Sequence, residues 1–296
     1  MLEMLMLSPL LFLSFICLLG LMVGSFLNVV IVRLPIILQK DWFNQCQSFL
    51  SENHNITIPT PTSEKTSFNL LVPRSHCPKC KHTVRAFDNI PILSYLLLGG
   101  KCRNCRTAIS IRYPLIESFT AILSLLTAYH FGLSIQLLPA LLFTWALIAL
   151  TMIDYDQQIL PDNITLPFLW LGLLVNLQNF YCTLPEAILG ASFGYIILWS
   201  LYWVFKLITG KEGMGYGDFK LLAMLGAWVG IKGLLPIILF SSLIGAIVGI
   251  TLILLKKHQK NVPIPFGPFL ASAGWIVFLY GDKIINYYFA LSGISA

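Results

Sequence analysis

Two aspartates stand where hydrophobic segments meet polar sequence. Asp218 ends KEGMGYGD and is followed by an apolar run, and Asp154 ends another apolar run in MIDYDQQILPD. A carboxylate at the edge of a hydrocarbon layer is costly unless it has a partner or a catalytic role. Glycines at 213, 215 and 217 let the backbone bend and let another chain approach closely. We therefore expect a carboxylate that is presented to an extended peptide at a membrane boundary.

Together, the two aspartates have the chemistry of an aspartyl protease. Two carboxylates brought close share a proton, so that one acts as base toward water while the other donates to the scissile carbonyl. The alternative is that Asp218 caps its helix and Asp154 merely ends another, and local sequence leaves that alternative open. Asp156 is a weaker candidate because it faces elsewhere on a continuing helix. Asp162, which follows a proline, is expected to cap the next helix.

Four cysteines form two matched pairs, Cys77-Pro-Lys-Cys80 and Cys102-Arg-Asn-Cys105. Each pair resembles one knuckle of a four-thiolate zinc site, in which tetrahedral Zn²⁺ closes a loop that has too small a core to fold alone. Four protein ligands leave no open coordination position, so the metal is expected to be structural. A catalytic zinc or a dithiol redox pair is the less favoured alternative, because four matched cysteines describe a closed site.

The elements that must position these residues are membrane helices. Of the 296 residues, 57% are apolar and only 11% are charged, whereas about a quarter of residues are charged in soluble domains. The sequence therefore predicts an all-α polytopic membrane protein with a small zinc-binding insert. The net charge of +6 does not indicate a nucleic-acid partner, because the basic residues are distributed like topology signals.

The basic residues gather in three clusters, which the positive-inside rule places in the cytoplasm. Eleven of the 19 lie between Arg33 and Arg112, and the other clusters are Lys206, Lys211 and Lys220, and Lys256, Lys257 and Lys260. Glu3 precedes the first apolar segment and Arg33 follows it, so the N-terminus is expected outside. Asp154 and Asp218 then share the cytoplasmic face. Lys220, two residues from Asp218, is interpreted as a topology anchor and not as its partner.

Three regions follow from this pattern: a first transmembrane helix at 1–33, a polar cytoplasmic insert at 34–113, and a transmembrane domain at 114–296. Within the insert, 38–51 has helical spacing and is expected to form an amphipathic helix. About eight spans are predicted in all, and those after the insert are 114–131, 135–153, 164–180, 185–208, 218–231, 234–255 and 266–290. Close helix packing is predicted at three small-residue pairs: Gly20 with Gly24, Gly190 with Gly194, and Gly245 with Gly249.

Other function classes fit less well. The glycine stretch 213–217 also matches a nucleotide or S-adenosylmethionine loop, but that pattern counts only after a strand in a βαβ unit. A transporter would place acids along its helices, whereas here they cluster at one face. A zinc-knuckle assembly subunit without chemistry would explain the cysteines and leave the two aspartates idle.

Long motifs in a fixed order resemble the type IV prepilin peptidases, which are bifunctional leader peptidases and N-methyltransferases of the GxGD class of membrane aspartyl proteases. The matching stretches cover nearly the whole chain: GSFLNVVIVRLP (24–35), RSHCPKC (74–80), DNIPILSYLLLGGKCRNC (88–105), ISIRYPLIE (109–117), IDYDQQILPD (153–162), GYGDFKLL (215–222) and PFGPFLA (265–271).

The resemblance implies that Asp154 and Asp218 are the catalytic pair and that Cys77, Cys80, Cys102 and Cys105 bind zinc. It also implies S-adenosylmethionine as methyl donor, with Gly100 tied to the methyl transfer. The expected substrates are prepilins and the pseudopilins of type II secretion, processed at the cytoplasmic face of the bacterial inner membrane, in contact with membrane lipid. Residues 36–70 match no motif, and their role stays unassigned.

Overall fold

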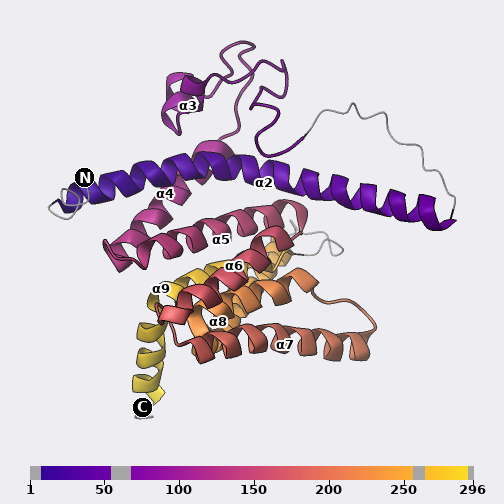
Figure 1. Ribbon diagram of the computed structural model, residues 1–296, viewed down its shortest axis with the longest axis vertical. Helices are drawn as coiled ribbons and strands as arrows, with labels where there is room; N and C mark the ends of the chain where they lie inside the picture. The colour runs from indigo at the N-terminus through magenta and orange to yellow at the C-terminus, as the bar shows by residue number, and fades with distance from the viewer. Residues whose placement is uncertain (1–7, 55–67, 256–263, 293–296) are drawn as a thin grey trace. The chain divides into compact units, whose positions relative to one another are not determined.

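The computed structural model describes residues 8–54, 68–255 and 264–292. Over these ranges the chain is helical, apart from loops and two isolated β-bridges, which confirms the predicted all-α class. The chain divides into two compact units, Met1–Tyr129 and His130–Ala296. The described helices are α2 (Pro9–His54), η1 (Ala86–Asn89), α3 (Leu93–Leu97), α4 (Arg112–Phe131), α5 (Leu137–Gln157), α6 (Asp162–Val175), η2 (Asn176–Gln178), α7 (Leu184–Thr209), α8 (Tyr216–Leu254) and α9 (Gly267–Ser292). Figure 1 labels α2 to α9.

The first helix of the chain is longer than predicted. α2 has 46 residues and runs through Pro35 to His54, so the expected end at residue 33 and the separate helix at 38–51 are corrected to one continuous helix. A proline inside a helix removes one backbone hydrogen bond, and α2 nevertheless continues through Pro35. Trp42 and Phe43 lie on its exposed surface.

α2 and α4 pack closely through the predicted small-residue pair. A Cβ atom added at Gly20 would lie 2.8 Å from the Cα of Ala121, and one added at Gly24 would lie 2.7 Å from the Cα of Glu117. Only glycine leaves room for backbones this close. The Asn28 side-chain amide also donates to the backbone carbonyl of Tyr113 at 3.2 Å. The prediction of close packing at Gly20 and Gly24 is therefore confirmed.

The second unit is built around α8, which packs against α6, α7 and α9. Gly190 of α7 and Gly226 of α8 meet backbone to backbone, and a Cβ at Gly194 would lie 2.7 Å from the carbonyl oxygen of Leu222. These contacts confirm the prediction for Gly190 and Gly194. At Gly245 and Gly249 the neighbours are side chains and not backbone. An added Cβ would lie 3.3 Å from the side chain of Phe269 at Gly245 and 3.6 Å from that of Ile264 at Gly249.

α8 bends at Gly230, whose φ of 73° and ψ of 176° are not helical. The label α8 therefore covers two helices that meet at a kink, and the predicted boundary between the spans 218–231 and 234–255 falls close to it. Polar contacts fix the helix before the bend: the Trp228 indole donates to the carbonyl of Phe168 at 2.8 Å, and the Asn176 amide donates to that of Ala227 at 2.9 Å.

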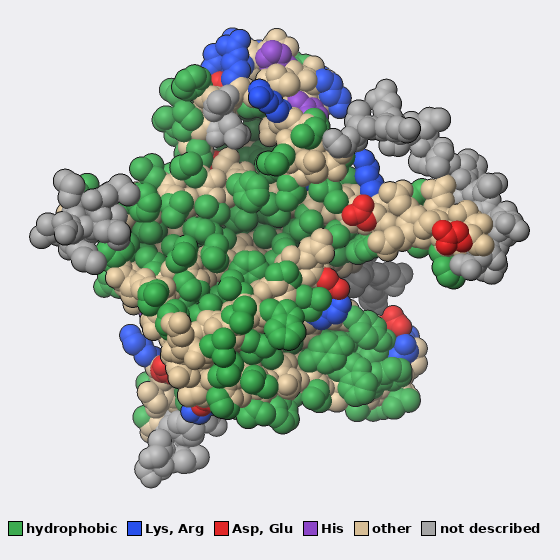
Figure 2. Space-filling view, in the orientation of Figure 1, with side chains coloured by type: hydrophobic (Ala, Val, Ile, Leu, Met, Phe, Trp, Pro, Cys, Tyr) green, Lys and Arg blue, Asp and Glu red, His purple; other side chains and the backbone are tan. Residues whose placement is uncertain are grey.

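Five described helices are long and apolar enough to cross a membrane: α2, α5, α7, α8 and α9. The chain is therefore a multi-pass membrane protein, while the prediction of about eight spans is not confirmed. α6, at 14 residues, is shorter than the roughly 20 residues that a span requires. Hydrophobic side chains cover much of the visible surface (Figure 2). Glu3 and the cluster Lys256, Lys257 and Lys260 lie outside the described residues.

Candidate active site and metal centre

Asp154 and Asp218 both lie at helix ends in the second unit. Asp154 is in the last turn of α5, which ends where Gln158 adopts a left-handed conformation with φ of 54°. Asp218 is in the first turn of α8. The residues are only 6% and 7% exposed, and the two carboxylates interact electrostatically. The structure thus brings together the two aspartates that the sequence singled out.

A backbone donor from a third helix completes this pair. The N–H of Gly267, the first residue of α9, donates to Oδ2 of Asp154 at 3.0 Å. A Cβ at Gly267 would lie 2.5 Å from the same oxygen, so a side chain there would displace the carboxylate. The start of a helix carries partial positive charge, which favours negative charge on Asp154.

The glycine stretch shapes the other side of the pair. Gly215, and not Asp218, is the N-cap of α8, so the alternative in which Asp218 caps its helix is wrong. A Cβ at Gly215 would lie 3.6 Å from Oδ2 of Asp218, and one at Gly217 would lie 2.8 Å from the Cβ of Leu160. The side chain of Leu160 also approaches Gly267, within 3.3 Å of an added Cβ. Leu160 therefore packs between two glycines beside the carboxylates.

The neighbouring acids have other roles. The N-cap of α6 is Pro161, without a side-chain cap, which corrects the expectation that Asp162 caps this helix. The carboxylate of Asp162 instead forms an ion pair with Lys220 at 2.7 Å. Lys220 is thus not a partner of Asp218, as predicted, but it does pair with another acid. Asp156 is exposed, in keeping with its weaker candidacy.

The four cysteines of the first unit converge on one point. All four Sγ atoms lie within 4.8 Å of one another, and those of Cys77 and Cys105 are 3.7 Å apart. A tetrahedral Zn²⁺ with Zn–S bonds of about 2.3 Å places its sulfurs roughly 3.8 Å apart. All four thiols are free of disulfides. This geometry fits a four-thiolate metal centre.

The two knuckles have the same local design. In the first, Cys77 donates its N–H to the carbonyl of His82 and accepts from the N–H of Lys81, both at 2.9 Å. In the second, Cys102 donates to Thr107 at 2.8 Å and accepts from Arg106 at 3.0 Å. Lys81 and Arg106 have matching positive φ values of 58° and 57°. This tight turn brings the two thiols of each pair to one side.

Hydrogen bonding prepares one of these thiols for a metal. The Cys105 Sγ lies 3.2 Å from the Thr107 hydroxyl. Hydrogen bonds from the Thr107 side chain and backbone lower the pKa of Cys105 to about 6. Because metals bind the thiolate form, this lowered pKa favours metal binding by Cys105.

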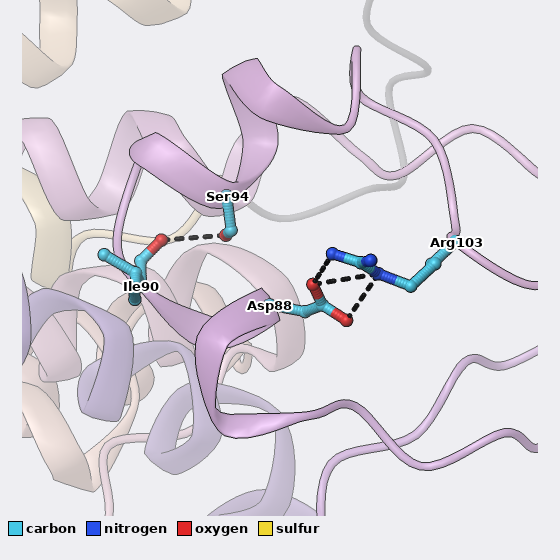
Figure 3. A network of polar contacts seen from close by, with 4 residues as sticks. All are labelled: Asp88, Ile90, Ser94 and Arg103. Carbon is cyan, nitrogen blue, oxygen red and sulfur yellow. Dashed lines mark hydrogen bonds and ion pairs between the residues drawn. The ribbon is translucent and has the colours of Figure 1, made fainter.

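Gly100 precedes the second knuckle and contacts α3. Its φ is 66°, and its N–H donates to the carbonyl of Tyr95 at 2.8 Å. A Cβ at Gly100 would lie 2.9 Å from the Tyr95 hydroxyl oxygen. The knuckle is also tied to η1, because Arg103 forms an ion pair with Asp88 at 2.6 Å (Figure 3). Residues 98–101, which we call the Gly100 segment, therefore lie between α3 and the metal centre.

Sequence reasoning missed the residues that support the pair and the Gly100 segment. The stretch PFGPFLA contains Gly267, but nothing in it indicates that its N–H reaches an aspartate 113 positions earlier. Leu160 and Tyr95 likewise look like ordinary apolar or aromatic positions. The only available signal was a glycine directly before Pro268, which suggests a helix start with a freely approachable backbone.

Models of known protein families match the sequence of both units. Residues 18–131 match the model of the bacterial peptidase A24 N-terminal domain, and residues 141–250 match the type IV leader peptidase family. Proteins named prepilin leader peptidase/N-methyltransferase are similar along nearly their whole length. That of Aeromonas salmonicida is 55% identical over 95% of this chain and 94% of its own, and that of Pseudomonas aeruginosa is 50% identical over 97% of each. That of Legionella pneumophila is 47% identical over 91% of each. No solved structure is significantly similar.

Proposed function

This chain belongs to the type IV leader peptidase family, and we propose that Asp154 and Asp218 are the carboxylates with which it hydrolyses its substrate. The chain is a prepilin leader peptidase and N-methyltransferase. It cleaves the leader from prepilins and methylates the N-terminal amine that cleavage creates. The observation that carries the proposal is the meeting of two buried, interacting carboxylates at the ends of α5 and α8.

The proposed hydrolysis needs one proton shared between the two carboxylates. The ionised aspartate takes a proton from water, and the resulting hydroxide attacks the scissile carbonyl while the protonated aspartate donates to its oxygen. As the C–N bond breaks, the aspartate that took the proton from water gives it to the leaving amine, and the other aspartate recovers a proton from a hydroxyl of the tetrahedral intermediate, so that the pair again shares one proton. We assign the base to Asp154, because the Gly267 N–H and the start of α9 favour its negative charge. Asp218 is then the acid.

The glycines beside the pair make room for the substrate backbone. Gly215 and Gly217, which lie just before Asp218, have no side chains. An extended peptide can therefore approach the backbone there closely enough to reach the buried carboxylate. Leu160 packs against Gly217, so part of this space is filled in the structure. We propose that the prepilin backbone runs along the glycine stretch, with its scissile bond at the two aspartates.

We further propose that Cys77, Cys80, Cys102 and Cys105 hold a structural Zn²⁺. Four thiolates in matched tight turns are typical of closed zinc sites, in which the metal supplies folding energy to a small loop-rich segment. The metal takes no part in hydrolysis under this proposal. Its role is to fix the two knuckles and, with them, the Gly100 segment.

Methyl transfer requires S-adenosylmethionine, and we propose that it takes place at the Gly100 segment of the first unit. The methyl acceptor is an amine that exists only after cleavage, so proteolysis is required for methylation but not the reverse. The proposed location is the bacterial inner membrane with the N-terminus outside and the aspartates at the cytoplasmic face, in accordance with the placement of Lys and Arg. Pseudopilins of type II secretion are further proposed substrates.

The contact between Gly267 and Asp154 leads to a prediction for cleavage. We expect Gly267→Ala to lower prepilin cleavage by about a hundredfold, the scale of a catalytic group displaced by about 1 Å, because the new Cβ would meet Oδ2 of Asp154. Gly249→Ala is the matched control, since the nearest described side chain to its added Cβ is that of Ile264, at 3.6 Å. Cleavage rates of purified protein on one prepilin measure both. Normal cleavage by Gly267→Ala would remove the proposed role of this contact.

Neighbouring glycines allow a controlled test of the methyl-transfer segment. Gly99 and Gly100 both have positive φ, of 57° and 66°, so alanine costs backbone strain at either position. At Gly100 the Cβ would meet Tyr95, whereas at Gly99 no described residue other than its chain neighbours lies within 4 Å of it. We therefore expect Gly100→Ala to lower methyl transfer by about tenfold or more, the scale of an overpacked contact, and Gly99→Ala to have little effect.

The readout is the mass of the processed pilin N-terminus, with cleavage followed in the same reaction. Cleavage should be normal in both glycine variants, because the aspartates belong to another unit of the chain. An intact methyl mark in Gly100→Ala, or cleavage lost together with methylation at normal protein levels, would show that the two activities are not divided in this way.

A further inference from the structure

A strained turn precedes α3. Ile92 has φ of 58° and ψ of −50°, and the Leu93 N–H donates to the carbonyl of Pro91. This is a γ-turn with positive φ, which is rare and strained, and its central residue is β-branched, for which positive φ is an outlier. Such a conformation persists only where surrounding contacts impose it, and it often marks a functional site.

Glu117 on α4 makes a hydrogen bond to the central residue of this turn. Its Oε2 accepts a hydrogen bond from the Ile92 N–H at 2.8 Å. Glu117 is only 8% exposed, and its side chain also bonds to Ser25 of α2. It is the third buried carboxylate among the described residues, beside Asp154 and Asp218. A carboxylate is costly to bury, yet hydrolysis makes no use of this one.

The turn determines where α3 begins and therefore where Tyr95 lies. The Ser94 hydroxyl donates to the carbonyl of Ile90 at 2.8 Å across the turn (Figure 3). One residue further on, Tyr95 accepts the Gly100 N–H through its carbonyl and places its hydroxyl against the glycine. A continuous set of contacts therefore joins Glu117 to Gly100 through Ile92 and α3.

We propose that Glu117 is a positioning residue for methyl transfer, which holds the strained Ile92 turn and thereby sets α3 and Tyr95 against Gly100. The inference rests on the proposed function, because it takes methyl transfer to occur at the Gly100 segment. Glu117 does not touch the reacting atoms. Its side chain is long enough to accept the hydrogen bond from the Ile92 N–H.

Two substitutions separate reach from charge. Glu117→Gln keeps an oxygen at the same reach and loses the charge, whereas Glu117→Asp keeps the charge and withdraws the acceptor by one methylene. We expect Glu117→Asp to lower methyl transfer by about tenfold to a hundredfold, the scale of a lost hydrogen bond to a charged group. Glu117→Gln should keep methyl transfer within about threefold. Both should cleave normally, as should Leu115→Ala, a control at an exposed position of α4.

The assay uses the full purified protein with a prepilin and S-adenosylmethionine, and it measures cleavage and the N-terminal methyl group in one reaction. The inference is overturned if Glu117→Asp methylates as well as Glu117→Gln, or if either variant loses cleavage along with methylation. Gly100→Ala in the same assay tests the underlying proposal. If it alone loses methyl transfer, only the role of Glu117 fails; if it also methylates normally, the proposed methyl-transfer segment fails.

Discussion

Replacing either Asp154 or Asp218 by Asn is expected to abolish prepilin cleavage while the protein still folds and inserts. A general acid and a general base each contribute about a hundredfold to ten-thousandfold to the rate. The side-chain amide of asparagine can perform neither role. Asparagine has nearly the same shape as aspartate, so the burial of both positions and the Gly267 N–H to Asp154 contact are preserved. The loss should therefore be chemical and not structural.

Immunoblots of prepilin and mature pilin in cells that produce each variant measure this loss. Asp156→Asn is the matched control, because this exposed carboxylate lies two residues from Asp154 in the same turn of α5. It should cleave at nearly the wild-type rate. Methylation should vanish with cleavage in both dyad variants, since the acceptor amine is never formed. Cleavage by Asp218→Asn at a rate close to that of Asp156→Asn would show that the protease assignment is wrong.

Loss of one cysteine ligand should have the second large effect. Cys102→Ser leaves three thiolates, and structural Zn²⁺ sites contribute on the order of 10 kcal/mol to the folding of such segments. We expect the variant to lose its zinc, to loosen both knuckles and to lose methyl transfer almost completely. Cleavage should fall less, because the aspartates and their supporting helices lie in a different unit.

Metal analysis of the purified protein, paired with the mass of the processed N-terminus, checks this expectation. The wild-type chain should carry one Zn²⁺. Cys46→Ser is the control, since this exposed thiol on α2 is not part of the cluster. A purified chain that carries no zinc and still methylates fully would exclude a structural metal at these cysteines.

The sequence singled out the four cysteines and the two aspartates by different signals. The CxxC pairs specify a four-thiolate cluster, and the structure places their sulfurs together. Asp154 and Asp218 were identified by the cost of a carboxylate beside a hydrophobic segment. The positive-inside rule placed both on one face, and the family resemblance implied that they act as a pair.

What the sequence did not predict depends on tertiary contacts. The helix at 38–51 has the correct secondary structure, but its continuity with α2 depends on Pro35 being tolerated inside a helix. Asp162 follows a proline like an ordinary helix cap, and only the folded chain shows that Lys220 binds it. The Ile92 turn contradicts the preference of its own side chain, so no local signal predicts it.

The most direct test of the account is a reaction that contains only the purified protein, a prepilin and S-adenosylmethionine in detergent. Mass spectrometry of the pilin should show loss of the leader, followed by gain of one methyl group on the new N-terminus. A transporter or a zinc-knuckle assembly subunit would leave the prepilin unchanged. If the folded, zinc-loaded protein leaves the prepilin intact, the claim that Asp154 and Asp218 form a proteolytic site is contradicted.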